Sequence, residues 1–198
     1  MENSGIYKFE CFKDKLSQES FSDFFDFYYA RLNKFAIAIV DSRVLAEEIV
    51  LDVFLKLWEH KSVLHTIRNI ETYLFISVRN TAVNALKKEQ KFTFDMLQDA
   101  HIQVADYKQT ADNQLIEHEM LQLLNETVNL LPPQCKIIFK LIREDGFNRN
   151  EVAQILNISA KTVDNQIAIA IAKIAARLQI DLSHPRNSSL LTSFLLTL

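Results

Sequence analysis

Residues 148–178, NRNEVAQILNISAKTVDNQIAIAIAKIAARL, contain the start and stop signals of two helices separated by a short turn. Asn148 and Glu151 have the spacing of a capping box, which begins the first helix. Asn157 tolerates the left-handed conformation that ends this helix without a glycine. Ser159 is then placed to cap a longer second helix. The stretch therefore predicts a helix-turn-helix.

The composition extends the helical prediction to the rest of the chain. The 198 residues include only two glycines and three prolines. Sheets need many tight turns, and turns with positive φ depend heavily on glycine. The two glycines, Gly5 and Gly146, also exclude the glycine-rich phosphate loops of nucleotide-binding enzymes. We expect an all-α protein.

Apolar residues recur at steps of three and four through most of the chain, which predicts helices. The predicted helices cover residues 19–40 (as one helix or two), 43–60, 70–90, 113–131 and 134–144, before the helix-turn-helix. Asp41-Ser42 supplies a break and an N-cap, Pro132-Pro133 opens a helix, and Gly146 ends it. Residues 61–69 resemble a polar loop or a bent turn.

The loss of this periodicity in one segment predicts two helical domains. Residues 91–112 gain aspartates and lose the apolar repeat, as an interdomain linker does. We expect domains at residues 1–90 and 113–182, followed by an apolar tail at 183–198. The tail is too short to span a membrane, and it could dock on the second domain or on a partner protein.

Several classes of site are not expected. Cys11 and Cys135 have no partner spacing for a disulfide framework or a zinc site, and the five histidines form no metal-binding or hydrolytic motif. We expect no metal and no cofactor. The N-terminus has no secretory signal, and no apolar run is long enough to cross a bilayer, so a cytoplasmic location is expected.

Three surfaces are candidates for binding, and the first is the second helix of the helix-turn-helix. In such motifs the N-terminal residues of this recognition helix contact base edges in the major groove. In this chain those residues are Ala160, Lys161, Thr162, Asp164, Asn165 and Gln166. The alternative is a hairpin that only packs. The net charge is −3 and no segment is strongly basic, which weighs against a protein that binds DNA alone.

The other two surfaces lie in the first domain. Acidic residues on residues 47–59 are by themselves more typical of a solvated helix face. Asn80, Asn84 and Lys88 follow one another at steps of four, with Tyr73 and Phe75 close enough in sequence to stack on bases. The alternative is that the two asparagines are buried and hydrogen-bonded inside the domain.

Two stretches together carry a family resemblance. Residues 21–60, FSDFFDFYYARLNKFAIAIVDSRVLAEEIVLDVFLKLWEH, with residues 69–88, NIETYLFISVRNTAVNALKK, resemble region 2 of the extracytoplasmic function (ECF) sigma factors. Residues 130–178, LLPPQCKIIFKLIREDGFNRNEVAQILNISAKTVDNQIAIAIAKIAARL, resemble their region 4. LuxR-type regulators share the region 4 pattern, whereas the pair in this order is specific.

The resemblance implies a transcription initiation subunit that is not an enzyme and that recognises and melts promoters as part of RNA polymerase. It assigns polymerase binding to Glu47, Glu48, Asp52, Lys56 and Trp58. It assigns the −10 element to the loop at residues 60–69 and to Tyr73, Arg79, Asn80, Asn84, Lys87 and Lys88. It assigns the −35 element to Arg149, Ser159, Lys161, Thr162, Asp164, Asn165, Gln166 and Lys173.

The partners implied by the resemblance are core RNA polymerase, promoter DNA and a membrane-bound anti-sigma factor, with no small-molecule substrate. Two alternatives remain open. A LuxR-like helix-turn-helix regulator would bind palindromic DNA without polymerase. An all-α scaffold would have no role in nucleic-acid binding.

Overall fold

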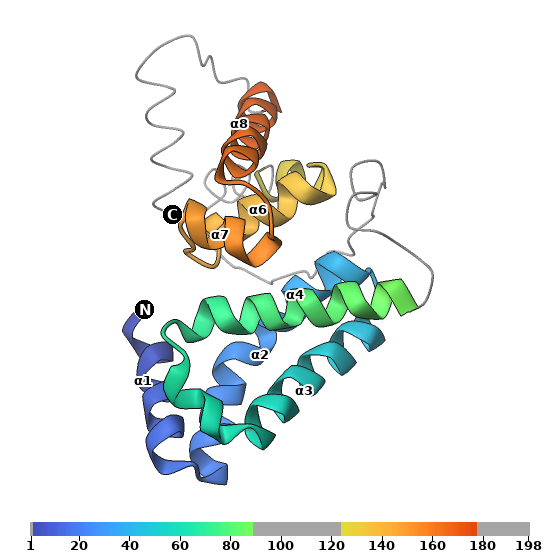
Figure 1. Cartoon of the computed structure of the whole chain (residues 1–198). Coiled ribbons are helices and arrows are strands. Elements are labelled where there is room, and N and C mark those ends of the chain that lie inside the picture. Colours follow the sequence, from blue (N-terminus) through green and yellow to red (C-terminus); the bar gives the residue numbers. More distant parts are fainter. Residues whose placement is uncertain (1, 89–123, 178–198) are drawn as a thin grey trace, which may run out of the picture. The chain divides into compact units, whose positions relative to one another are not determined.

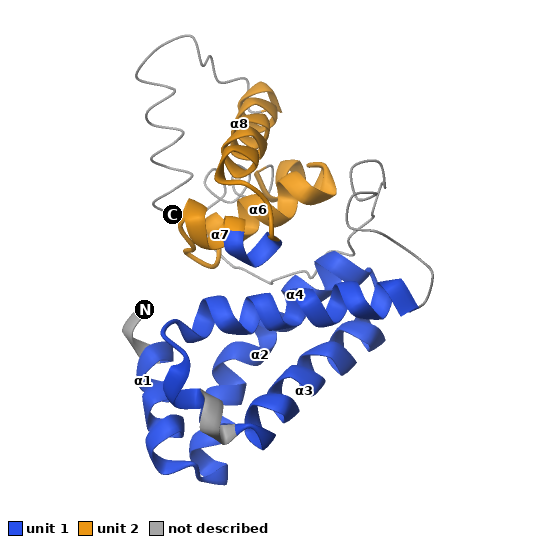
Figure 2. Ribbon diagram, viewed as in Figure 1, with its two compact units in different colours: residues 1–94, 154–156 blue, residues 95–153, 157–198 orange. Residues whose placement is uncertain are grey.

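The computed structural model describes residues 2–88 and 124–177, and all regular structure in these ranges is helical. The chain divides into two compact units, one of residues 1–94 with 154–156 and the other of residues 95–153 with 157–198 (Figure 2). The all-α prediction is confirmed. The predicted linker at 91–112 and the apolar tail at 183–198 lie outside the described residues, and the domain boundaries stay predictions.

The first unit is a bundle in which α2 is the central helix (Figure 1). Its elements are α1 (Glu2–Lys15), α2 (Gln18–Val40), α3 (Arg43–Glu59), the 3-10 helix η1 (Lys61–Thr66) and α4 (Ile70–Lys88). Helix α2 packs against α1, α3 and α4, and α3 also packs against α4. The predicted segment at residues 19–40 is thus a single helix.

Short polar side chains set the helix ends in this unit. The Ser17 hydroxyl caps α2 by accepting from the Ser20 N–H, and the Ser42 hydroxyl caps α3 by accepting from the Leu45 N–H at 3.3 Å. Between the two helices Asp41 is left-handed, with a φ of 50°. The break and cap predicted at Asp41-Ser42 are confirmed.

Aromatic side chains fill the centre of the first unit. Phe12, Phe24 and Tyr28 have no exposed surface, and Phe54 is 2% exposed. The Phe12 and Phe24 rings stack with centroids 5.4 Å apart, and Phe24 meets Phe54 edge-on at 5.9 Å. Burying each such side chain contributes about 1.5–3 kcal/mol, so this cluster holds α1, α2 and α3 together.

The sequence pattern does not predict α1 or η1 as helices. The apolar periodicity predicts no element before residue 19, yet Phe9 and Phe12 of α1 are buried. Residues 61–66 form a 3-10 helix where a loop or bent turn was expected, and Leu64 in it is fully buried. Helix α1 packs against α2, and η1 contacts α1 and α3. Local sequence does not indicate these tertiary contacts.

The second unit contains residues 124–129, α6 (Pro133–Arg143) and α8 (Ala160–Arg177), with α6 packed against α8. It also contains α7 (Arg149–Leu156) apart from its last three residues, 154–156, which are grouped with the first unit. Pro133 begins α6, as the sequence predicts. Of the helix predicted at residues 113–131, residues 113–123 lie outside the described range. One apolar core cluster joins the segment before α6 to both helices and consists of Val128, Leu131, Cys135, Phe139, Ala170, Ile174 and Ala175.

The predicted boundaries of the helix-turn-helix are confirmed at the level of hydrogen bonds. Asn148 Oδ1 accepts from the Glu151 N–H at 3.1 Å, while Glu151 Oε2 accepts from the Asn148 N–H at 2.9 Å. Asn157 is left-handed, with a φ of 55°, and the Ser159 hydroxyl accepts from the Thr162 N–H at 3.0 Å. Gly146 is left-handed as well, with a φ of 75°.

Candidate functional site

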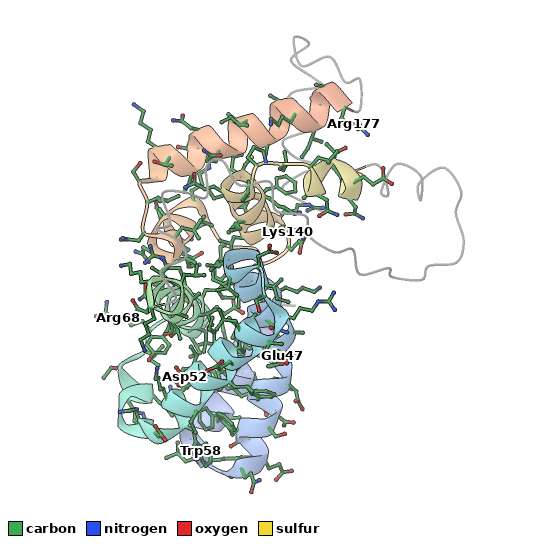
Figure 3. The ribbon with its side chains drawn as sticks, turned by 90° about the vertical axis from the view of Figure 1, so that its right-hand side faces the viewer. Glu47, Asp52, Trp58, Arg68, Lys140 and Arg177 are labelled. Atoms are coloured by element: carbon green, nitrogen blue, oxygen red, sulfur yellow. The ribbon has the colours of Figure 1, made fainter. Side chains whose placement is uncertain are left out.

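The predicted polymerase-binding residues lie mainly on the outer side of α3 (Figure 3). Glu47, Glu48 and Lys56 are exposed, and Asp52 is partly exposed. Lys56 Nζ lies 2.6 Å from Asp52 Oδ2, so the two charges are paired one turn apart. This side of α3 therefore carries a net negative charge from the two glutamates.

The same helix exposes apolar side chains that belong to none of the predicted sites. Val44 is 78% exposed, Leu51 50% and Leu55 54%. Leu51 follows Val44 by seven residues and Leu55 follows Leu51 by four, and side chains at these spacings lie on the same side of a helix. The three residues therefore form one exposed apolar stripe. The sequence does contain a signal for this stripe, because Leu51 and Leu55 do not belong to the apolar repeat that predicts the buried side of residues 43–60. We call the stripe and the adjacent acidic residues the α3 face.

Trp58 differs from the other residues predicted to bind polymerase. Its ring lies 4.9 Å from the Phe21 ring and stacks 6.0 Å from the Phe12 ring. The side chain is only partly exposed. It belongs mainly to the edge of the aromatic cluster, so its contribution to the α3 face is through packing.

The amides predicted on α4 are on the surface. Asn80 and Asn84 are exposed, as are Lys87 and Lys88. The alternative in which both asparagines are buried is therefore wrong. Asn80 Oδ1 accepts from Arg79 Nη1 at 3.0 Å, and partial burial lowers the pKa of the Arg79 guanidinium.

The two aromatic residues of α4 divide between surface and core. Tyr73 is 36% exposed. Phe75 is fully buried, with its ring 5.0 Å from that of Phe35. The suggestion that Phe75 stacks on a base is wrong because neighbouring α2 covers it. Only Tyr73 is accessible, beside the exposed amides and lysines, and together these residues form the α4 face.

The N-terminal half of α8 presents polar residues on one side and packs on the other. Lys161, Asp164 and Asn165 are exposed, whereas Val163 is fully buried. Thr162 and Gln166, also predicted to bind DNA, are partly exposed, and Lys173 farther along is exposed.

Some of the predicted DNA-binding residues already have partners. The Ser159 hydroxyl caps α8 and lies 2.8 Å from the Thr162 hydroxyl. Arg149, at the start of α7, lies with its Nη1 3.1 Å from Asp164 Oδ1 on α8. The structure thus brings Arg149 and Asp164 together from the two helices of the motif.

Within residues 2–88 and 124–177 no group of three histidine, cysteine, aspartate or glutamate side chains could hold a metal ion. No helix in the same ranges is long and apolar enough to cross a membrane.

Comparisons with known proteins match both halves of the chain. Residues 24–92 match the family model of Sigma-70 region 2, and residues 121–174 match that of Sigma-70, region 4. No curated protein matches the chain significantly.

Among solved structures, the chain is similar to the sigma factor RpoE of Bartonella quintana, determined in complex with the anti-sigma factor NepR. The TM-score is 0.58 with 20% identity, over 82% of this chain and 99% of that one. It is also similar to CnrH, determined in complex with the cytosolic domain of CnrY, with a TM-score of 0.52 and 18% identity over 90% and 99% of the two chains. These likenesses support the fold.

Proposed function

Because the chain belongs to the extracytoplasmic function sigma factors, we propose that it binds core RNA polymerase and directs initiation at promoters with its own −10 and −35 elements. The observation that carries this proposal is the presence of both sigma regions, in order, on one chain. The region 2 match over residues 24–92 favours this function over that of a LuxR-like regulator, which shares only the region 4 pattern.

The α3 face is the proposed polymerase-docking surface. Its exposed Leu51 and Leu55 have no function in the core of the first unit, and Glu47 and Glu48 add negative charge beside them. A surface with an apolar centre and charged edges is typical of a protein–protein interface. It fits a polymerase surface that is apolar and basic.

The α4 face is the proposed −10 surface. The exposed amides of Asn80 and Asn84 can hydrogen-bond to base edges, Tyr73 can stack on an unpaired base, and Lys87 and Lys88 can contact phosphates. Extruding a base costs a few kcal/mol, and such hydrogen bonds and stacking would offset that cost. This arrangement supports promoter melting by the first unit.

The N-terminal half of α8 is the proposed −35 surface. Its exposed Lys161, Asp164 and Asn165 have the donors and acceptors that major-groove recognition requires. Val163 is buried beneath them, so the helix has a clear inner side and outer side. Ser159 and Thr162 are proposed to contact phosphates while maintaining the cap.

An anti-sigma factor is a further proposed partner. RpoE and CnrH were both determined with a bound partner, the anti-sigma factor NepR in one case and the cytosolic domain of CnrY in the other. The membrane attachment of this partner stays a prediction.

Reconstitution with purified core polymerase, followed by mapping of transcript starts, tests the proposal. The wild-type chain should produce transcript starts at a fixed distance from shared upstream elements.

Asp52→Arg should abolish association with core polymerase while leaving the fold intact, because the side chain is partly exposed. Asp26→Arg on α2 makes the same charge change at an exposed position outside the proposed surfaces and should associate normally. Normal association of Asp52→Arg would refute the assigned docking surface.

A further inference from the structure

The ion pair between Arg149 and Asp164 is not explained by helix stability. Arg149 is the first residue of α7, where the helix dipole disfavours a positive charge. Asp164 lies beyond the first turn of α8, so its carboxylate gains little from the dipole of that helix. The Arg149 side chain is 63% exposed and that of Asp164 is 50% exposed. Such a pair contributes at most about 1 kcal/mol.

The position of Asp164 poses an electrostatic problem for a DNA-binding helix. The residue is on the outer side of α8, between exposed Lys161 and Asn165. A carboxylate there is repelled by phosphates and is accommodated only where the DNA offers a hydrogen-bond donor. In the major groove these donors are the amino groups at cytosine N4 and adenine N6.

We propose that Arg149 and Asp164 together recognise one C·G base pair of the −35 element, an inference that rests on the proposed function of α8. The Asp164 carboxylate accepts from cytosine N4, and Arg149 donates to guanine O6 and N7. In the base pair, N4 and O6 are hydrogen-bonded at about 2.9 Å. Arg149 Nη1 and Asp164 Oδ1 are 3.1 Å apart, so the protein pair has a matching spacing of donor and acceptor.

An A·T pair fits the same two side chains less well. Adenine N6 lies beside the acceptor N7, which repels the second carboxylate oxygen of Asp164. Thymine offers only O4 to Arg149, next to its methyl group, whereas guanine offers two adjacent acceptors. The combination of a guanidinium and a carboxylate therefore selects C·G.

The test uses holoenzyme made from the full chain and core polymerase, with a promoter library randomised across the −35 element. Sequencing of transcripts should show that wild type prefers C·G about tenfold at one position. Asp164→Ala and Arg149→Ala should both lose the preference at that same position and keep the preferences elsewhere. Asp164→Asn should shift it toward A·T, because an amide pairs with adenine N6 and N7.

The matched control is Glu144→Ala. It removes the carboxylate of another exposed ion pair in the second unit, with Lys140 at 3.7 Å, outside the proposed DNA surface. Its base preferences should equal those of wild type. Asp164→Asn keeps the size of the side chain, so a changed preference in that variant cannot result from misfolding.

A uniform decrease across the library for Asp164→Ala and Arg149→Ala would overturn the inference and leave the proposed function intact. Effects of the two variants at different positions would overturn it as well. If wild-type holoenzyme showed no promoter-specific transcription, the proposed function itself would fail, and recognition of the base pair with it.

Discussion

At the scale of single residues, the exposed leucines of α3 test polymerase docking most directly. Leu55→Ala should weaken binding to core polymerase about tenfold. The substitution removes side-chain carbons whose burial at the interface contributes about 1–2 kcal/mol. Stability should change little, since Leu55 is 54% exposed. Fluorescence anisotropy with labelled chain measures the dissociation constant.

The control for Leu55→Ala is Ile6→Ala. Ile6 is 52% exposed on α1, so a similar amount of apolar surface is removed away from the α3 face. Equal losses of affinity in the two variants would argue against a specific apolar contact at Leu55.

The asparagines of α4 test promoter melting. Asn80→Ala and Asn84→Ala should keep normal core binding, because both amides are exposed and lie outside the α3 face. They should reduce opening of the −10 region, measured by permanganate reactivity of unpaired thymines. The control is Ser22→Ala, which removes an exposed polar side chain on α2, outside the proposed surfaces. Unchanged promoter output in both asparagine variants is what the scaffold alternative predicts.

The cysteines provide a chemical test of the second unit. Cys135 is fully buried, and burial raises the pKa of its thiol to about 11, although nearby Lys173 opposes the shift. The fold therefore favours the neutral thiol. The resulting stabilisation is complete below the ordinary thiol pKa and is lost as the pH rises toward 11.

Native chain treated with iodoacetamide at pH 8 should therefore be alkylated at Cys11, which is partly exposed, and protected at Cys135. Denaturant or a pH near 11 should remove the protection, which mass spectrometry of the two peptides detects. Equal rates for both thiols in native chain at pH 8 would contradict the described core.

At the scale of elements, the sequence predicts best where a structure depends on neighbouring residues. The caps at Ser42, Asn148 and Ser159 were all predicted, because each requires only a side chain and a backbone N–H two or three residues away. The burial of Phe75 is not predicted, because it depends on which helix packs against α4.

Helix α1 shows the same limit. Its two buried rings, Phe9 and Phe12, do not form a long apolar repeat, and the helix is stabilised by contacts with α2 and η1. Gly5 in this helix would be unfavourable in isolation, since glycine costs about 0.5–1 kcal/mol relative to alanine. Its function is evident only in the packed unit. A β-carbon there would lie 2.5 Å from the Tyr28 hydroxyl oxygen and 2.6 Å from Phe27 Cε1.

Gly5→Ala should therefore lower the free energy of unfolding of the first unit by about 1–3 kcal/mol. At an exposed helical position the same substitution would instead stabilise the helix. The Tyr28 ring cannot move freely, because it is fully buried and its hydroxyl donates to Glu71 at 3.3 Å. Urea denaturation gives the free energy of unfolding. A more stable variant would show that α1 does not pack closely on α2 in solution.

At the scale of the whole molecule, the distribution of charge separates a polymerase subunit from an independent DNA-binding protein. The net charge is −3, and the exposed cations of the α4 face and of α8 are few. Non-specific affinity for DNA depends on phosphate contacts by lysine and arginine, so it should be low for the free chain. In the proposed function the polymerase supplies the missing attraction and holds the two units at separate promoter elements.

The free chain should therefore bind a −35 duplex only weakly in a gel-shift assay, with no preference for palindromic DNA, whereas holoenzyme should bind the complete promoter specifically. Sedimentation should show that the free chain is monomeric on DNA. A LuxR-like regulator would instead bind a palindrome tightly as a dimer without core. Tight, palindrome-specific binding by the free chain would contradict dependence on polymerase, because a chain of this charge would then have to gain its affinity from base contacts of a paired second unit.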